Sequence, residues 1–191
     1  AYEFNGYWKD VGTLGSYWEA NMELIDLIPE FNLYEEYWKI YTKSDTIEPL
    51  YVSPEGHSER SIIGEGTENY GYVQNSVIGS NVKIGKGAVI RDSIIMRDAV
   101  IGDRCTIDKS IIAENSRIGE GAVLGVGEEA PNVLNESIYS FGLVTVGEDT
   151  VIPENVRIGK NTAISGKTVH EDYPNGELAG GQVIIKAGDG K

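Results

Sequence analysis

The sequence predicts a mainly β protein whose central part is a parallel β-helix, in which the chain winds into stacked triangular coils. Ile78, Ile95 and Ile112 follow one another at intervals of 17 residues. Two more series keep this interval, and neighbouring series are six, six and five residues apart; they are Ile84, Ile101 and Ile118, and Ile90, Ile107 and Leu124. Hexapeptide repeats of this kind are the sequence signature of a parallel β-helix.

The repeat continues on both sides of these series. Val73 lies 17 residues before Ile90, and from Val146 onward an aliphatic residue recurs every six positions. Each hexapeptide forms one wall of a triangular coil. The repeats therefore predict about five or six coils, which are stable only as a stack. We expect thirteen aliphatic side chains to point inward and form the core: Ile78, Ile84, Ile90, Ile95, Ile101, Ile107, Ile112, Ile118, Leu124, Val146, Ile152, Ile158 and Ile164.

Two further positions of the hexapeptide have expected roles. Glycine often follows the aliphatic residue, as at Gly85 and Gly102. We expect these glycines to relieve the corners, where backbone angles would be costly for a residue with a Cβ. A small residue stands four places after the aliphatic residue, where two walls converge; this slot contains Ala88, Ala99, Cys105, Ser116, Ala122, Thr150 and Thr162.

The chain ahead of the repeat has a different pattern. Residues 2–11 are expected to form a strand with a turn at Asn5-Gly6, and a helix should follow. Ser16, with Glu19 three residues later, predicts a capping box at its start, and Pro29 closes the segment. The high apolar content of residues 1–28 indicates that this segment docks on a surface.

We therefore divide the chain into residues 1–28, a linker at 29–60, the β-helix at 61–168, and a C-terminal tail at 169–191 with a candidate edge strand at 183–186. The stretch Gly125–Tyr139 interrupts the repeat, and so long a loop is usually functional or faces another subunit. The chain starts without Met and inside the expected strand, so we expect it to be a piece of a longer protein.

Composition excludes several classes of function. The formal net charge is −14 and the pI is near 4.5, which argues against a protein that binds nucleic acid or anionic membranes. No run of about 20 apolar residues and no export signal occur, so we expect a cytoplasmic protein without a membrane span. The single cysteine excludes an intrachain disulfide framework.

The β-helix itself shows no recognisable catalytic motif. Hexapeptide acyltransferases use a histidine near the coils as general base, but the two histidines here, His57 and His170, are expected in the linker and beyond the last coil. A zinc site with three histidine ligands would also need more histidines than one chain supplies.

One candidate for chemistry remains, Asp10 in the stretch Tyr7-Trp8-Lys9-Asp10-Val11-Gly12-Thr13. Asp10 would end the expected strand just before a glycine turn that opens a helix, which is where ligands gather in α/β sheets. Mg²⁺ takes one or two carboxylates together with phosphate oxygens. The alternative is an ordinary surface or capping carboxylate.

These residues resemble the end of the catalytic domain of bacterial ADP-glucose pyrophosphorylase (glucose-1-phosphate adenylyltransferase). The resemblance covers the heptapeptide at 7–13, then Ser16-Tyr17-Trp18-Glu19-Ala20-Asn21, and extends to Asn75-Ser76-Val77 and to 92–96 in the repeat. It implies that the β-helix is left-handed. It also implies that residues 1–28 are the terminal strand and helix of an α/β nucleotidyltransferase domain.

In a full-length enzyme, the resemblance implies transfer of an adenylyl group from ATP to glucose 1-phosphate, which releases pyrophosphate and forms ADP-glucose for glycogen or starch synthesis. Asp10 would be a catalytic residue and a ligand of Mg²⁺, and Trp8, Lys9 and Gly12 would lie at the substrate. The nucleotide loop and the second metal carboxylate would lie upstream, so this chain alone is expected to be inactive and to hold no cofactor. Its role would be to build a homo-oligomer, a tetramer in the parent, and to take part in the response to an anionic effector such as a sugar phosphate.

Several alternatives stay open. The parent could be a non-catalytic regulatory subunit of the same family, or another sugar-1-phosphate nucleotidyltransferase of the GDP-mannose type. Basic residues near the coils could bind the effector or form solvated faces; they are Arg60, Lys83, Arg91, Arg97 and Arg104. Val77, Ile94 and Ile111 are expected on the outside of the walls, where they could pack on a partner subunit.

Overall fold

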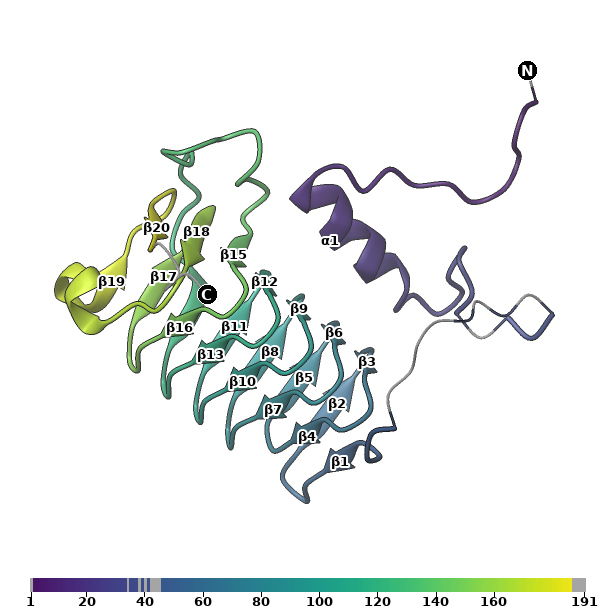
Figure 1. Ribbon diagram of the computed structural model, residues 1–191, viewed down its shortest axis with the longest axis horizontal. Helices are drawn as coiled ribbons and strands as arrows, with labels where there is room; N and C mark the ends of the chain where they lie inside the picture. The colour runs from purple at the N-terminus through teal and green to yellow at the C-terminus, as the bar shows by residue number, and fades with distance from the viewer. Residues whose placement is uncertain (1, 34, 38, 40, 42–45, 187–191) are drawn as a thin grey trace.

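The computed structural model describes residues 2–33, 35–37, 39, 41 and 46–186. A parallel β-helix dominates it, with one α-helix lying along its side (Figure 1). Sheet A contains β1 (Tyr51–Val52), β4 (Glu68–Asn69), β7 (Lys83–Ile84), β10 (Val100–Ile101), β13 (Arg117–Ile118) and β16 (Val151–Ile152). Sheet B contains β2 (His57–Glu59), β5 (Tyr72–Gln74), β8 (Val89–Arg91), β11 (Thr106–Asp108), β14 (Val123–Val126), β17 (Arg157–Gly159) and β19 (Glu177–Leu178). Sheet C contains β3 (Ile62–Ile63), β6 (Val77–Ile78), β9 (Ile94–Ile95), β12 (Ser110–Ile112), β15 (Val144–Val146), β18 (Thr162–Ser165) and β20 (Val183–Ile185).

The 17-residue interval of the sequence is the step from one coil to the next. Ile101 in β10 pairs with Ile84 on one side and with Ile118 on the other, and all neighbouring strands are parallel. Like residues therefore stack in ladders about 4.8 Å apart. All thirteen aliphatic residues expected in the core lie in one buried cluster. The small residues expected where walls converge are fully buried as well: Ala88, Ala99, Cys105, Ser116, Ala122, Thr150 and Thr162.

The glycines that follow the aliphatic residues have a different role from the one expected. Gly85 and Gly102 do not have positive φ. A Cβ at Gly85 would lie 2.6 Å from the backbone nitrogen of Asp103, and a Cβ at Gly102 would lie 2.7 Å from that of Glu120. Glycine is needed there because stacked coils approach closely. The left-handed backbone of the corner occurs two residues later, as at Gly87 with φ 66°.

The β-helix is longer than the predicted 61–168. β1 and β2 join sheets A and B inside the expected linker, and β19 and β20 extend sheets B and C into the expected tail. Pairing with the adjacent coil satisfies their backbone hydrogen bonds, so these short strands form although the sequence around them lacks a clear repeat. The candidate edge strand is present as β20, whereas residues 187–191 lie outside the described part. Two short 3₁₀ turns, η1 (His170–Asp172) and η2 (Pro174–Gly176), precede β19.

The expected N-terminal strand does not form: residues 2–13 contain no strand. A strand needs a neighbour for its backbone groups, and residues 2–13 pair with none of the strands in the described part of the chain. The expected helix is present as α1 (Leu14–Glu23), but its cap is Thr13 and not Ser16. Ser16 occupies the third helical position, where its side chain and that of Thr13 bond reciprocally to each other's backbone N–H. No helix within the described ranges is long and apolar enough to cross a membrane.

Helix α1 docks on the outer face of sheet C (Figure 1). Leu14, Tyr17, Trp18 and Met22 of α1 pack, with Met96, against a buried cluster of Ile94, Ile111 and Leu143. Ile94 and Ile111 are each only 3% exposed, so this chain's own helix covers two of the three wall residues considered for a partner subunit. The β-helix itself is therefore the surface on which α1 docks, whereas Tyr2, Phe4 and Trp8 of the segment before α1 stay exposed.

Trp18 anchors this contact at two corners of the coil. Its indole Nε1–H donates to the backbone oxygen of Asp92 at 2.7 Å. The ammonium of Lys109, one coil further on, lies 5.4 Å from the ring centroid. Since both groups belong to corners where φ is positive, 47° at Asp92 and 43° at Lys109, the fold of the coils fixes the position of α1.

Candidate functional site

Asp10 lies in the irregular segment that leads into α1. Its Oδ1 accepts a hydrogen bond from the backbone N–H of Gly12 at 3.0 Å. This tight turn has little spare room, since a Cβ at Gly12 would lie 3.1 Å from the same oxygen. Thr13 then caps α1. The turn thus holds one carboxylate oxygen while the side chain stays on the exposed surface.

Lys9 is engaged with two carboxylates of α1. Its Nζ donates to Glu23 Oε1 and lies 3.6 Å from Glu19 Oε2. Glu23 Oε2 also accepts a hydrogen bond from the Tyr7 hydroxyl at 3.1 Å. The bond with Lys9, and then that with Tyr7, lowers the pKa of Glu23, while the bond to Glu23 raises the pKa of Lys9. Partial desolvation, followed by Glu23, raises the pKa of Tyr7.

The sequence prediction missed Glu23, and it assigned Glu19 to a capping box and not to Lys9. Glu19 and Glu23 lie four residues apart on α1 and so share one helix face. A lysine in the segment just before such a face could have been recognised as their partner. The consequence is that Lys9, expected at the substrate, is paired with carboxylates in this structure.

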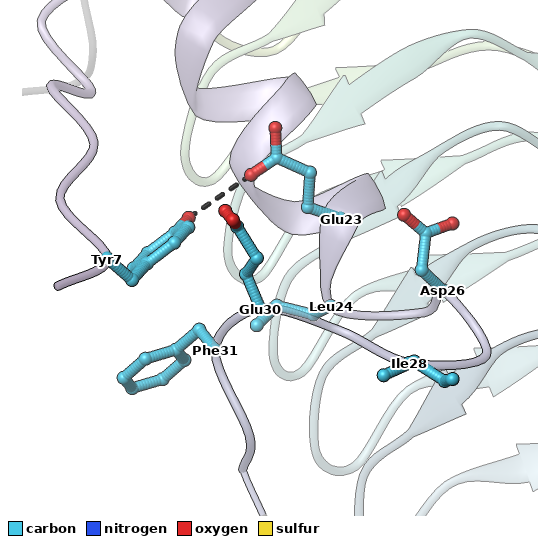
Figure 2. Close-up of a pocket in the computed structure, with 7 residues that line it drawn as sticks. All are labelled: Tyr7, Glu23, Leu24, Asp26, Ile28, Glu30 and Phe31. Atoms are coloured by element: carbon cyan, nitrogen blue, oxygen red, sulfur yellow. Dashed lines mark hydrogen bonds between the residues drawn. The ribbon is translucent and has the colours of Figure 1, made fainter.

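The pocket in this region is acidic (Figure 2). It has a volume of about 260 Å³ and lies between the N-terminal segment and the end of α1. Its lining consists of Tyr7, Glu23, Leu24, Asp26, Ile28, Glu30 and Phe31. Three carboxylates make it unsuitable for a phosphate, and none of Trp8, Asp10 and Gly12 lines it. Trp8 is 76% exposed instead.

Asp10 suits a shared metal site better than a complete one. Within the described part of the chain, no group of three or more His, Cys, Asp or Glu side chains could hold a metal ion. An exposed carboxylate fixed by a backbone N–H fits a single ligand of Mg²⁺, with the other ligands coming from phosphates or from elsewhere.

The five basic residues near the coils do not converge on one site. Four of them have carboxylate partners: Arg60 with Asp26 at 3.4 Å, Lys83 with Glu68 at 3.4 Å, Arg97 with Asp98 at 3.0 Å, and Arg104 with Glu120. Arg91 is exposed on sheet B. These pairs lower the positive potential that an anionic effector would meet.

The histidines also differ from expectation in one respect. His57 is in β2 and therefore on a wall, where its ring stacks on that of Tyr72 at 5.6 Å and 4°. His170 is in η1, and its Nε2 lies 3.0 Å from the backbone oxygen of Glu154. Both histidines are exposed on the outer surface.

Comparison with known proteins agrees with this architecture. The family model described as "EIF2B subunit epsilon LbH domain" matches residues 53–129, and LbH denotes a left-handed β-helix. The left-handed coil expected from the resemblance is thereby supported.

Curated relatives cover nearly the whole chain. The relative from Lachnospira eligens, named glucose-1-phosphate adenylyltransferase, is 69% identical over 189 residues, which are 99% of this chain and 45% of the relative. Relatives of the same name from Acetivibrio thermocellus and Thermotoga neapolitana are 43% and 45% identical over 99% and 97% of this chain, and 44% of each relative. The chain therefore spans slightly less than half the length of these relatives and matches their C-terminal portion.

Among solved structures, the acetyltransferase domain of PglB from Neisseria gonorrhoeae FA1090 covers 69% of this chain and 55% of its own at 18% identity. Its TM-score of 0.43 is too low to support an argument about function.

Proposed function

This chain is homologous to the C-terminal portion of curated glucose-1-phosphate adenylyltransferases, and from that premise we propose that it is the C-terminal part of such an enzyme. The observation that carries the proposal is the 69% identity over 99% of the chain, with the heptapeptide at 7–13 included. In the proposed reaction, a phosphate oxygen of glucose 1-phosphate attacks the α-phosphorus of ATP. The bond to the leaving pyrophosphate breaks as the new phosphorus–oxygen bond forms.

Asp10 is the catalytic carboxylate contributed by this chain. It would hold Mg²⁺ together with a second carboxylate from the upstream part, and the ion would neutralise charge on the reacting phosphates. The N–H of Gly12 fixes Oδ1, so the carboxylate meets the metal with one preset orientation. Trp8 and Gly12 lie beside Asp10 and are proposed to contact substrate; Lys9 reaches a phosphate only by leaving Glu23.

The β-helix has an architectural role in this proposal. It has a closed core of its own and carries Asp10 through the docked helix α1, so it can hold the end of the catalytic domain in place. We propose that it also builds a homotetramer and takes part in binding an anionic effector such as a sugar phosphate. An effector at Arg60, Lys83, Arg97 or Arg104 would compete with the carboxylate partners of these residues. The proposed location is the cytoplasm.

The test is an activity assay on two proteins. We expect no ADP-glucose synthesis from the purified 191-residue chain, and Mg²⁺-dependent synthesis from the full-length Lachnospira eligens relative. In that relative, replacing the residue aligned with Asp10 by asparagine should lower kcat by at least about 100-fold, as expected for loss of a charge that stabilises the transition state. Asp108→Asn at the aligned position in sheet B is the matched control and should leave kcat unchanged.

Each rival predicts a different outcome. A regulatory subunit would be inactive at full length, and a GDP-mannose type enzyme would prefer GTP and mannose 1-phosphate. Synthesis of ADP-glucose by the 191-residue chain alone would contradict the proposal that the upstream part supplies the nucleotide site.

A further inference from the structure

The loop between β14 and β15, residues 127–143, projects from the β-helix next to the start of α1 (Figure 1). The loop ends later than the predicted Gly125–Tyr139, because it continues to residue 143. It also begins later, because Val126 in β14 still pairs with Gly159. Its backbone is held firmly. Buried Asn161 donates from Nδ2 to Ala130 O at 3.0 Å and accepts from Gly142 N at 2.7 Å.

A second buried asparagine holds the tip. Asn132 Nδ2 donates to the backbone oxygen of Asn161 at 2.7 Å, and its Oδ1 accepts from the N–H groups of Leu134 and Asn135 at 2.9 and 3.0 Å. The N–H of Val133 bonds to Gly181 O at 2.9 Å in the coil beneath. The conformation of the loop is thus determined by the β-helix.

This well-held loop presents apolar side chains to solvent. Val133 is 66% exposed, Leu134 56%, Ile138 46% and Phe141 54%; we call these four residues the loop surface. Exposed apolar residues gathered on a preorganised loop are unusual for a free surface and typical of one that binds a partner. Phe141 also has φ 64°, an outlier for an aromatic residue.

The position of the loop surface indicates the partner. The ring of Phe141 lies against Gly15, so close that a Cβ on Gly15 would be 2.6 Å from it. Gly15 is five residues from Asp10, and the segment before it exposes Tyr2 (91%), Phe4 (63%) and Trp8 (76%) without forming a strand. Phe141 therefore lies beside the start of α1, which the polypeptide enters from its upstream side through the segment that exposes Tyr2, Phe4 and Trp8.

We propose that the loop surface docks on the upstream part of the full-length polypeptide, the part that makes up more than half of the length of the curated relatives. The inference rests on the proposed function only in taking this chain as the C-terminal part of a longer protein. The docked loop would fix the upstream domain directly to the coils, in addition to the covalent path through α1. It would thereby hold the two sides of the Asp10 site in register.

Hydroxyl-radical footprinting tests this proposal without an activity assay. We expect side-chain oxidation at the positions aligned with Leu134, Ile138 and Phe141 to be at least about fivefold slower in the full-length Lachnospira eligens relative than in the 191-residue chain. Val169, 48% exposed beyond the last sheet A strand, is the matched control and should be oxidised equally in both. Equal oxidation of the loop surface in both proteins would overturn the proposal.

A crosslink distinguishes the upstream part from a second copy. A photo-crosslinking amino acid at the position aligned with Leu134 should join the loop to an upstream peptide of the same polypeptide, which leaves the mass of one chain on a denaturing gel. Crosslinks at the mass of two chains, or slower oxidation as the 191-residue chain is concentrated, would assign the loop to a second copy and refute the proposal. If the full-length relative shows no adenylyl transfer but its loop surface is still protected from oxidation, the result counts against the proposed function and not against the docking of the loop.

Discussion

Replacing Trp18 tests the claim that the coils hold α1 in place. Trp18→Ala removes the hydrogen bond to Asp92 O, worth about 0.5–1.5 kcal/mol, and the cation–π contact with Lys109, about 0.5–1 kcal/mol. It also removes part of the apolar contact with Ile94 and Ile111, about 1 kcal/mol for a half-buried ring. The sum is about 3 kcal/mol. Since an isolated helix of this length is marginal in water, α1 should undock and unfold together.

Hydrogen exchange of the α1 amides measures the effect. Undocking by about 3 kcal/mol corresponds to exchange that is ~100-fold faster, while the amides of the buried strands should be unchanged. Trp18→Phe keeps most of the ring and loses the hydrogen bond, so about fivefold faster exchange is expected. Trp8→Ala, at a 76% exposed position, is the control. Unchanged exchange in Trp18→Ala, or an equal change in Trp8→Ala, would refute the assigned anchor.

Three more outcomes are expected from the structure. In denaturant unfolding, Ile101→Ala should lower the free energy of unfolding by about 2–5 kcal/mol, because it leaves a cavity in the core. Val100→Ala, on the half-buried outer face, should lower it by less than about 1.5 kcal/mol. Equal losses in the two variants would contradict the inward orientation of Ile101. Burial raises the pKa of the Cys105 thiol, so a thiol reagent at neutral pH should label it only after unfolding, and rapid labelling of the native chain would show that its slot is open. The contacts with Lys9 and Tyr7 lower the pKa of Glu23, so they stabilise the N-terminal segment at neutral pH. This stabilisation should be lost as the pH falls through the lowered pKa, which lies below the ordinary range of a glutamate. NMR shifts of the Tyr7 ring should follow this transition, and Glu23→Gln should abolish it.

The candidate site could be predicted only in part. The heptapeptide located Asp10 from chemistry and resemblance, and the Thr13 cap shows that this residue lies just before a helix, as expected. The pattern of Glu19 and Glu23 offered carboxylate partners for Lys9, but which of them Lys9 bonds was decided by how residues 7–9 fold back along α1. The loop surface could not be predicted either, since the exposure of Leu134 and Ile138 follows from hydrogen bonds that Asn161 makes from a later coil.

The sequence by itself determined the coils: an aliphatic residue at a fixed interval can be buried at every turn only if each turn of chain stacks on the last. The interval between Ile84, Ile101 and Ile118 specifies the stacking of each coil on the one before it. Only contacts between adjacent coils are needed for this. Only the tertiary structure decided what lies against the outside of the coils, because Ile94 and Ile111 could equally have met a second subunit. It also decided that residues 2–13 form no strand, since a strand depends on a neighbouring strand that local sequence cannot supply.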